Sequence, residues 1–278
     1  MLSVYPRLPL RRLRVGVLIG ADPCVCTGQS HGIVPTVSKT VSTRRTYRTF
    51  THKDATYRIC CEEYEAVVAE IVHQRQILED YIALHPDFGR TFEPIELHDN
   101  APPIAQRMAR AAWLAGVGPM AAVAGAMAQY AAEAGLKAGA REVIVDNGGD
   151  IYLRVDEPAI IGLDSGGAEL ANKLAFSLNA EDTPIAICSS SGRMGHSTSL
   201  GQCDLATVVS KNAALADAAA TRAANLVKKV DDVDDALEQI AAIEGVDGVM
   251  IVKDARVGLA GELPPLVKIQ KDQARVPA

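Results

Sequence analysis

The centre of the chain reads Glu142-Val143-Ile144-Val145-Asp146-Asn147-Gly148-Gly149-Asp150-Ile151-Tyr152-Leu153-Arg154-Val155. Apolar and β-branched residues lie on both sides of the double glycine, and this pattern predicts two strands, 142–146 and 151–155, joined by a tight turn. The two glycines allow positive φ angles and let a ligand approach the backbone closely. An Asn-Gly pair is also the usual signal of a simple type I′ hairpin, so the turn has both a structural and a functional interpretation.

Further strand-like runs surround this hairpin, and their short, turn-rich connections favour largely antiparallel sheets. Before it, residues 44–61 are expected to form another hairpin. After it, the expected strands are 159–163, 174–178, 185–189, 205–210, 248–252, 256–259 and 266–269.

Helices are predicted on either side of the strands. Apolar residues recur every three or four positions over 63–84, which indicates a long amphipathic helix that ends before Pro86. The other expected helices are 101–115, 120–137, 213–228 and 232–243. The segment 120–137 is so rich in Ala and Gly that we expect it to be buried against a sheet. Helices that cluster early and late around strands indicate an α+β fold, which we expect to form two mixed layers.

The chain has 278 residues, of which 48% are hydrophobic and 22% are charged, as in ordinary globular domains. Residues 1–40 show no apolar period and contain several prolines, so we expect a disordered N-terminal extension and a single domain at 41–278. The apolar run 15–21 only loosely imitates a secretory signal, and no apolar stretch has the length of a membrane span. We therefore expect a cytoplasmic protein without a membrane partner.

Composition and common motifs exclude several functions. The formal net charge of −6 argues against nucleic acid as a partner, because phosphate backbones require a basic surface. The six cysteines match neither paired zinc knuckles nor a disulfide framework, so free thiols in a reducing compartment are expected. The chain also lacks an H-E-x-x-H motif, which removes the common zinc-protease template.

A polar loop follows the strand 185–189 and contains Ser190, Ser191, Gly192, Arg193 and His196. Its hydroxyl and N–H groups could cradle a phosphate, to which Arg193 would add charge and a planar hydrogen-bonding fork. His196 is a candidate proton donor or phosphate contact. The alternative is a solvated connector in which the histidine is an ordinary surface residue.

Two further candidates belong to predicted helices. Asp217 and Thr221 are four residues apart, so both oxygens can face one hard cation or a metal-bound phosphate. The alternative is that Thr221 bonds to the carbonyl of residue 217 and Asp217 pairs with an arginine. The segment Gly116-Val117-Gly118-Pro119-Met120 opens the buried helix and could offer free N–H groups to an anion.

Four segments taken together resemble an uncharacterised family related to the ApbE-type flavin transferases. They are 116–125, 147–151, 189–192 with 195–197, and 216–221, within a resemblance that covers about residues 44–269. The resemblance implies an ApbE-like fold. For the wider group it also implies magnesium-dependent cleavage of FAD, with transfer of FMN to a threonine of an acceptor protein.

The motifs and the resemblance together suggest roles for single residues. Asp217 and Thr221 would bind magnesium, and His196 would be the catalytic proton donor or contact the diphosphate. The ligand would be FAD or a related flavin, a pterin or another phosphorylated, nucleotide-like cofactor. Its binding residues would be Gly116, Gly118, Asn147, Gly148, Gly149, Asp150, Ser190, Ser191, Gly192 and Arg193.

We expect metal-assisted FMN or nucleotidyl transfer, with a protein acceptor and a homo-oligomer as partners. The transferases carry Asp-x-Gly-Gly-x-x-Lys-Gly where this chain has Gly116-Val117-Gly118-Pro119-Met120-Ala121-Ala122-Val123, without the acid and the lysine. This difference favours an alternative, a non-enzymatic cofactor-binding or assembly factor in cofactor metabolism. The sequence therefore leaves open whether the protein is an enzyme.

Overall fold

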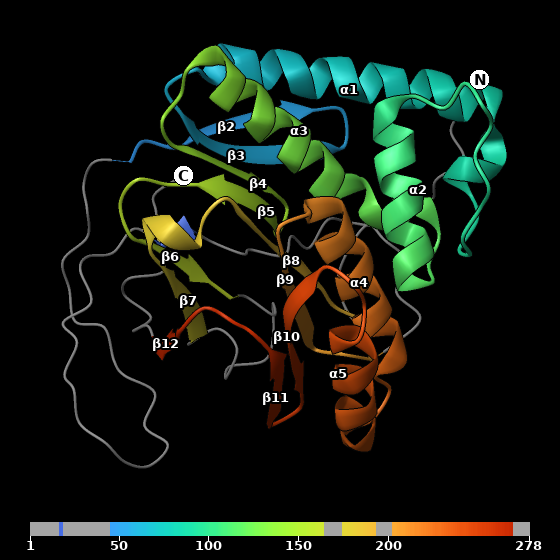
Figure 1. Ribbon diagram of the computed structural model, residues 1–278, viewed down its shortest axis with the longest axis vertical. Helices are drawn as coiled ribbons and strands as arrows, with labels where there is room; N and C mark the ends of the chain where they lie inside the picture. Colours follow the sequence, from blue (N-terminus) through green and yellow to red (C-terminus); the bar gives the residue numbers. More distant parts are fainter. Residues whose placement is uncertain (1–16, 19–44, 164–173, 193–201, 269–278) are drawn as a thin grey trace.

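The computed structural model describes residues 17–18, 45–163, 174–192 and 202–268. These residues form three layers, in which a large central sheet separates a layer of helices from a smaller sheet (Figure 1). The expected α+β class with largely antiparallel sheets is confirmed. The expectation of two layers is wrong, because the central sheet is apolar on both faces and each face is covered.

The central sheet has the strand order β11-β10-β9-β8-β5-β4-β3-β2 within the described residues, and all neighbouring strands are antiparallel. The predicted hairpin around the double glycine lies in its middle as β4 and β5. The strands are β2 (Arg48–His52), β3 (Ala55–Cys61), β4 (Val143–Asn147), β5 (Asp150–Arg154), β8 (Ile185–Ser190), β9 (Leu205–Ser210), β10 (Val246–Lys253) and β11 (Arg256–Gly261).

The smaller sheet has the order β1-β6-β7-β12 and is also antiparallel. Its strands are β1 (Val17–Leu18), β6 (Ala159–Gly162), β7 (Leu174–Leu178) and β12 (Leu266–Lys268). Strand β1 comes from the segment 1–40 and pairs with β6; the other residues of that segment lie outside the described ranges.

Five α-helices within the described ranges lie on one side of the central sheet, where α2 packs on α4 rather than on a strand (Figure 1). They are α1 (Tyr64–Leu84), α2 (Pro103–Ala115), α3 (Val123–Ala138), α4 (Ala213–Leu226) and α5 (Val233–Ala241). Helix α1 ends just before Pro86, as predicted, and α2 ends at Gly116, whose φ of 67° is the left-handed conformation that glycine adopts readily. Helix α3 starts later than expected, because Pro119–Ala122 forms a separate 3-10 turn, η2.

Alternation along each strand divides the core in two. In β4, Val143 and Val145 pack against the helices, whereas Ile144 packs against the smaller sheet. In β5, Tyr152 belongs to the helix side, and Ile151 belongs to the other side. Because side chains on a strand point alternately to opposite faces, Asp150 lies on the helix face with Tyr152, and Asp146 lies on the opposite face with Ile144.

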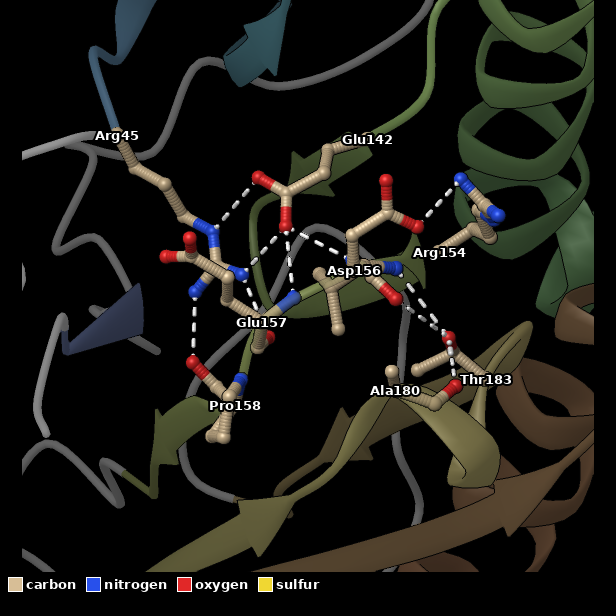
Figure 2. A network of polar contacts seen from close by, with 9 residues as sticks. Arg45, Glu142, Arg154, Asp156, Glu157, Pro158, Ala180 and Thr183 are labelled. Atoms are coloured by element: carbon tan, nitrogen blue, oxygen red, sulfur yellow. Dashed lines mark hydrogen bonds and ion pairs between the residues drawn. The ribbon is translucent and has the colours of Figure 1, made fainter. Parts of the chain in front are cut away.

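A buried ion pair between Arg45 and Glu142 fastens the segment before β2 to the central sheet (Figure 2). The Arg45 guanidinium bonds both carboxylate oxygens of Glu142 at 2.8 and 3.2 Å and donates to the carbonyls of Glu157 and Pro158. Burial alone would raise the pKa of Glu142, but the hydrogen bonds from Arg45 and from the Asp156 N–H lower it below its ordinary value. This network joins residue 45, β4 and the turn after β5.

Among the described residues, no helix is by itself long and apolar enough to cross a membrane. In the described ranges, one bent pair, α2 with 119–138, meets such criteria by length and composition, with a bend of 104° between the two parts.

Candidate functional site

The turn between β4 and β5 combines a hairpin with buried acidic groups. Gly148 and Gly149 both have positive φ, 70° and 112°, while Asn147 and Asp150 face each other in the ladder. The N–H of Gly149 donates to Oδ1 of Asp146 at 3.0 Å. The conformation is that of a two-residue hairpin that requires residues tolerant of positive φ, as the structural interpretation of Asn-Gly-Gly predicted.

The first turn of α3 is the meeting point of three of the four sequence motifs. Asn147 of the hairpin donates from Nδ2 to the carbonyl of Ala124 at 3.2 Å. Asp217 of α4 accepts at Oδ2 a 2.9 Å hydrogen bond from the N–H of Gly125. The Ala124-Gly125 end of the segment 116–125, rather than its beginning, therefore contacts the other motifs.

Helices α3 and α4 cap each other. The first N–H groups of a helix have no partner within the helix, and Asp217 supplies an acceptor to the start of α3. In return, Oε1 of Gln129 in α3 accepts the N–H of Ala213, the first residue of α4, at 2.9 Å. Asp217 thus has a structural role that differs from the arginine pairing considered above.

Close backbone packing makes this exchange geometrically feasible. A Cβ atom on Gly125 would lie 2.1 Å from the carbonyl oxygen of Ala213 and 2.9 Å from Cβ of Asp217. Only glycine can occupy position 125 without moving α4, because the obstructing atom is backbone.

Three buried carboxyl groups surround the hairpin: Asp146, Asp150 and Asp217 are 3%, 8% and 8% exposed. Asp150 stands opposite Cys188 of β8 in the ladder, and its Oδ1 has no hydrogen-bond partner among the described residues. No lysine or arginine in those ranges forms an ion pair with Asp150 or Asp217. Asp150 on β5 and Asp217 on α4 therefore form an acidic pair without a basic partner in the described part.

The electrostatics follow from this arrangement. Burial, and then the negative charge of Asp217, raise the pKa of Asp150 well above its ordinary value. Burial also raises the pKa of Asp217, although the N–H groups of Gly125 and Ala124 oppose the shift. Burial raises the pKa of Asp146 to about 6, against the Gly149 N–H and the nearby Arg58.

The Cys188 thiol lies beside the acidic pair and is neutral. Burial and the charges of Asp150 and Asp217 raise its pKa well above the ordinary thiol value. The sulfur lies 3.5 Å from the carbonyl oxygen of Ala213, to which it donates. A thiol that does not ionise is a poor nucleophile, so Cys188 is a packing group with a polar edge.

The glycines Gly116 and Gly118 serve local packing in this structure. Gly116 caps α2 in the left-handed conformation. A Cβ atom on Gly118 would lie 2.0 Å from the Thr91 carbonyl oxygen, so this glycine admits the chain segment that follows η1 (Pro86–Gly89). Their predicted role as ligand-binding residues stays a prediction.

The Ser-rich segment continues from β8, next to Asp150. Ser190 and Ser191 are buried, and the Gly192 N–H donates to the carbonyl of Cys203 at 2.9 Å. Arg193 and His196, the predicted phosphate contact and catalytic group, lie outside the described residues. The structure therefore places the beginning of this loop beside the acidic pair.

The residues on the helix face fit a hard divalent cation. Thr221 is buried one turn after Asp217 on α4, and together with Asp150 the three side chains offer only oxygen donors. Mg²⁺ prefers such ligands and commonly uses one or two carboxylates with water and phosphate oxygens. No cluster of three or more His, Cys, Asp or Glu suited to a metal occurs in the described ranges. A cation here would thus need threonine, water or phosphate oxygens as well.

Sequence reasoning gave no role to Ala124, Gly125 and Asp146, although they lie in the quoted motifs, and it did not single out Gln129. Gly125 had a visible signal, since a glycine inside an alanine-rich helix often marks close helix packing. Gln129 had none, because its role depends on the spatial approach of α4.

Known proteins resemble this chain in sequence or in fold. A family model described as "AbpE bacteria" matches residues 44–257. A UPF0280 protein of Archaeoglobus fulgidus is 42% identical over 78% of this chain and 92% of its own length. A UPF0280 protein of Methanothrix thermoacetophila is 41% identical over 74% of this chain and 86% of its own length.

Among solved structures, the flavin transferase ApbE from Vibrio cholerae matches with a TM-score of 0.51 and 13% identity, over 78% of this chain and 96% of that one. Helices on one side of a large antiparallel sheet, together with this match, define the ApbE fold. The chain belongs to the family described as "AbpE bacteria".

Proposed function

We propose that the protein binds a phosphorylated, flavin- or nucleotide-like cofactor between the β4–β5 turn, the start of α3 and α4, and transfers FMN or a nucleotidyl group from it. The acidic pair Asp150 and Asp217 carries this proposal, because one buried carboxylate oxygen of Asp150 has no hydrogen-bond partner among the described residues and Asp217 lies nearby. Buried carboxylates without a basic partner are typical of functional sites that hold a cation. The fold shared with the Vibrio cholerae flavin transferase supports a flavin as ligand.

Each motif has a role in the proposed reaction. Asp217 and Thr221 would hold Mg²⁺, which would neutralise charge on a diphosphate. Gly148 and Gly149 leave the turn without side chains, so a planar ligand can approach the backbone. Ser190, Ser191, Gly192 and Arg193 would contact phosphate, and His196 would donate a proton or contact the diphosphate. With FAD, the diphosphate bond would break, FMN would pass to an acceptor hydroxyl that loses its proton, and AMP would leave.

A turnover assay tests this proposal. The purified full chain is incubated with FAD and Mg²⁺, AMP and FMN are separated by chromatography, and the protein is weighed by mass spectrometry. AMP together with FMN, either free or attached to protein, is the expected result. FAD that is neither bound nor cleaved would contradict the proposal.

The second candidate is a non-enzymatic cofactor-binding or assembly factor. The absence of the acid and lysine of the transferase motif from 116–123 favours it. Flavin-fluorescence quenching and equilibrium dialysis separate the two candidates. Saturable binding of FAD that remains intact over hours would favour the carrier, whereas AMP release would exclude a purely passive role.

The cytoplasmic location, the protein acceptor and the homo-oligomer stay predictions. Mass spectrometry of the small molecule that co-purifies with the protein would identify the ligand directly. Light scattering on the purified chain would determine the oligomeric state.

A further inference from the structure

We infer that Asp150 is a metal ligand, and that Asp150 and Asp217 together bind one divalent cation between β5 and α4 before any nucleotide is present. This role, which rests on the proposed function, differs from the contact with the organic cofactor expected for Asp150. The cation site would thus be built from two elements, a strand and a helix, rather than from α4 alone.

The first observation is the unused bonding capacity of Asp150. The side chain is 92% buried, since 8% is exposed, and its Oδ1 atom has no hydrogen-bond partner among the described residues. The Cys188 thiol and the Ser189 N–H are the groups that stabilise its charge. A buried carboxylate oxygen with no donor is strongly unfavourable unless a proton or a cation occupies its free side.

The second observation is the position of Asp217. Its Oδ2 atom accepts the Gly125 N–H at 2.9 Å at the positive end of α3, where a carboxylate is favoured. This hydrogen bond holds Asp217 in place and favours its ionised form. Asp217 on α4 and Asp150 on β5 thus bring two carboxyl groups to the place where these two elements pack together, and carboxylate oxygens are ligands for a divalent cation.

Other neighbours do not supply the missing charge. Cys188 is a neutral thiol, and no basic side chain of the described ranges pairs with either acid. Asp146 faces the other side of the sheet, stands opposite Arg58 in the β3–β4 ladder, and bonds the Gly149 N–H. Asp146 is therefore a matched control: it is a buried acid on the same hairpin that should not ligate the cation.

The test uses the full chain after treatment with EDTA, with Mn²⁺ as the probe and without flavin or nucleotide. The electron paramagnetic resonance signal of free Mn²⁺ reports binding. We expect one Mn²⁺ per chain, displaced by Mg²⁺. Asp150→Asn and Asp217→Asn should each weaken binding by about tenfold or more, whereas Asp146→Asn should remain close to wild type.

Stability provides a second measurement. Without divalent cations, the melting temperature of Asp150→Asn should be no lower than that of the wild type, because the substitution removes repulsion between buried acids. When Mn²⁺ is added, the wild type and Asp146→Asn should gain stability, whereas Asp150→Asn and Asp217→Asn should not. If Asp150→Asn does not fold, Asp150→Ser allows the same comparison without the charge.

Two results would overturn the inference. The first is a folded Asp150 variant that binds Mn²⁺ as tightly as the wild-type chain does. The second is a wild-type chain that does not bind Mn²⁺, which would indicate that the two acids share a proton instead. If the chain binds FAD but does not bind Mn²⁺ in the absence of nucleotide, the two-acid metal site is contradicted and the proposed function is not. Mn²⁺ binding without any flavin binding would contradict the proposed function and leave the metal site supported.

Discussion

The N–H of Gly125 donates a 2.9 Å hydrogen bond to Oδ2 of Asp217, although 92 residues separate the two positions. Gln129 and Ala213 form the reciprocal bond, so each of the helices α3 and α4 supplies an acceptor for the start of the other. The candidate metal ligand is therefore also a helix cap. Substitutions at Asp217 must be designed so that these two roles can be separated.

Asp217→Ala and Asp217→Asn separate the cap from the charge. Both remove the negative charge, but only Asn retains an oxygen that can accept the Gly125 N–H. We expect Asp217→Ala to be less stable than Asp217→Asn by about 1 kcal/mol, the usual worth of a helix N-cap. Urea unfolding in EDTA measures the difference. Equal stability of the two variants would show that the cap contributes little.

Gly125→Ala should destabilise the protein by about 3 kcal/mol or more, because its Cβ would lie 2.1 Å from the backbone oxygen of Ala213. Gly89→Ala is the control, since the nearest atoms to its Cβ belong to the Ile82 side chain, with Cγ2 at 2.9 Å, and a side chain can move where a backbone cannot. Chemical denaturation of both variants checks the order. A Gly125→Ala protein as stable as the control would contradict the described packing of α3 against α4.

The pH dependence of stability should report the buried acid Asp146. Burial raises its folded pKa to about 6 from an ordinary value of 3.8, so the folded state binds its proton more tightly than the unfolded state. Its favourable contribution is complete below about pH 4 and is lost as the pH rises through about 6, a loss of about 3 kcal/mol.

Asp146→Asn keeps an acceptor for the Gly149 N–H and removes this titration. The variant should be more stable than wild type at pH 8, and the two should converge as the pH falls toward 4. Melting temperatures in EDTA across this range provide the measurement. If the difference in melting temperature between the two proteins does not vary with pH, the raised pKa of Asp146 is refuted.

Arg45→Met should destabilise the chain by on the order of 3 kcal/mol, because it removes the cation that pairs with Glu142 and the hydrogen bonds that Arg45 donates to the carbonyls of Glu157 and Pro158. Arg45 is 4% exposed in its side chain, whereas Arg154, which pairs with Asp156, is 37% exposed. Arg154→Met should therefore cost less than about 1 kcal/mol. Similar losses in the two variants would argue against a special role of the Arg45 network.

Local pattern predicted most elements of the fold. The expected strands 174–178 and 205–210 coincide with β7 and β9, and the helix 63–84 differs from α1 by one residue. These segments have strong periodicity and clear end signals, such as Pro86 after α1. The start of α3 was predicted too early, because the pattern of small residues does not distinguish the 3-10 turn at Pro119–Ala122 from the helix that follows.

By itself, the sequence determined the hairpin at Gly148-Gly149, the antiparallel α+β class and the motifs that resemble the ApbE group, since these depend on backbone preferences and spacing within short segments. Only the tertiary structure decided that Asp217 caps α3, that Asp150 and Asp217 are neighbours and that Asp146 faces the opposite side. Those relationships depend on how α3, α4 and β5 pack together, and these elements are far apart in the sequence. The energy of a buried charge also depends on all the groups around it.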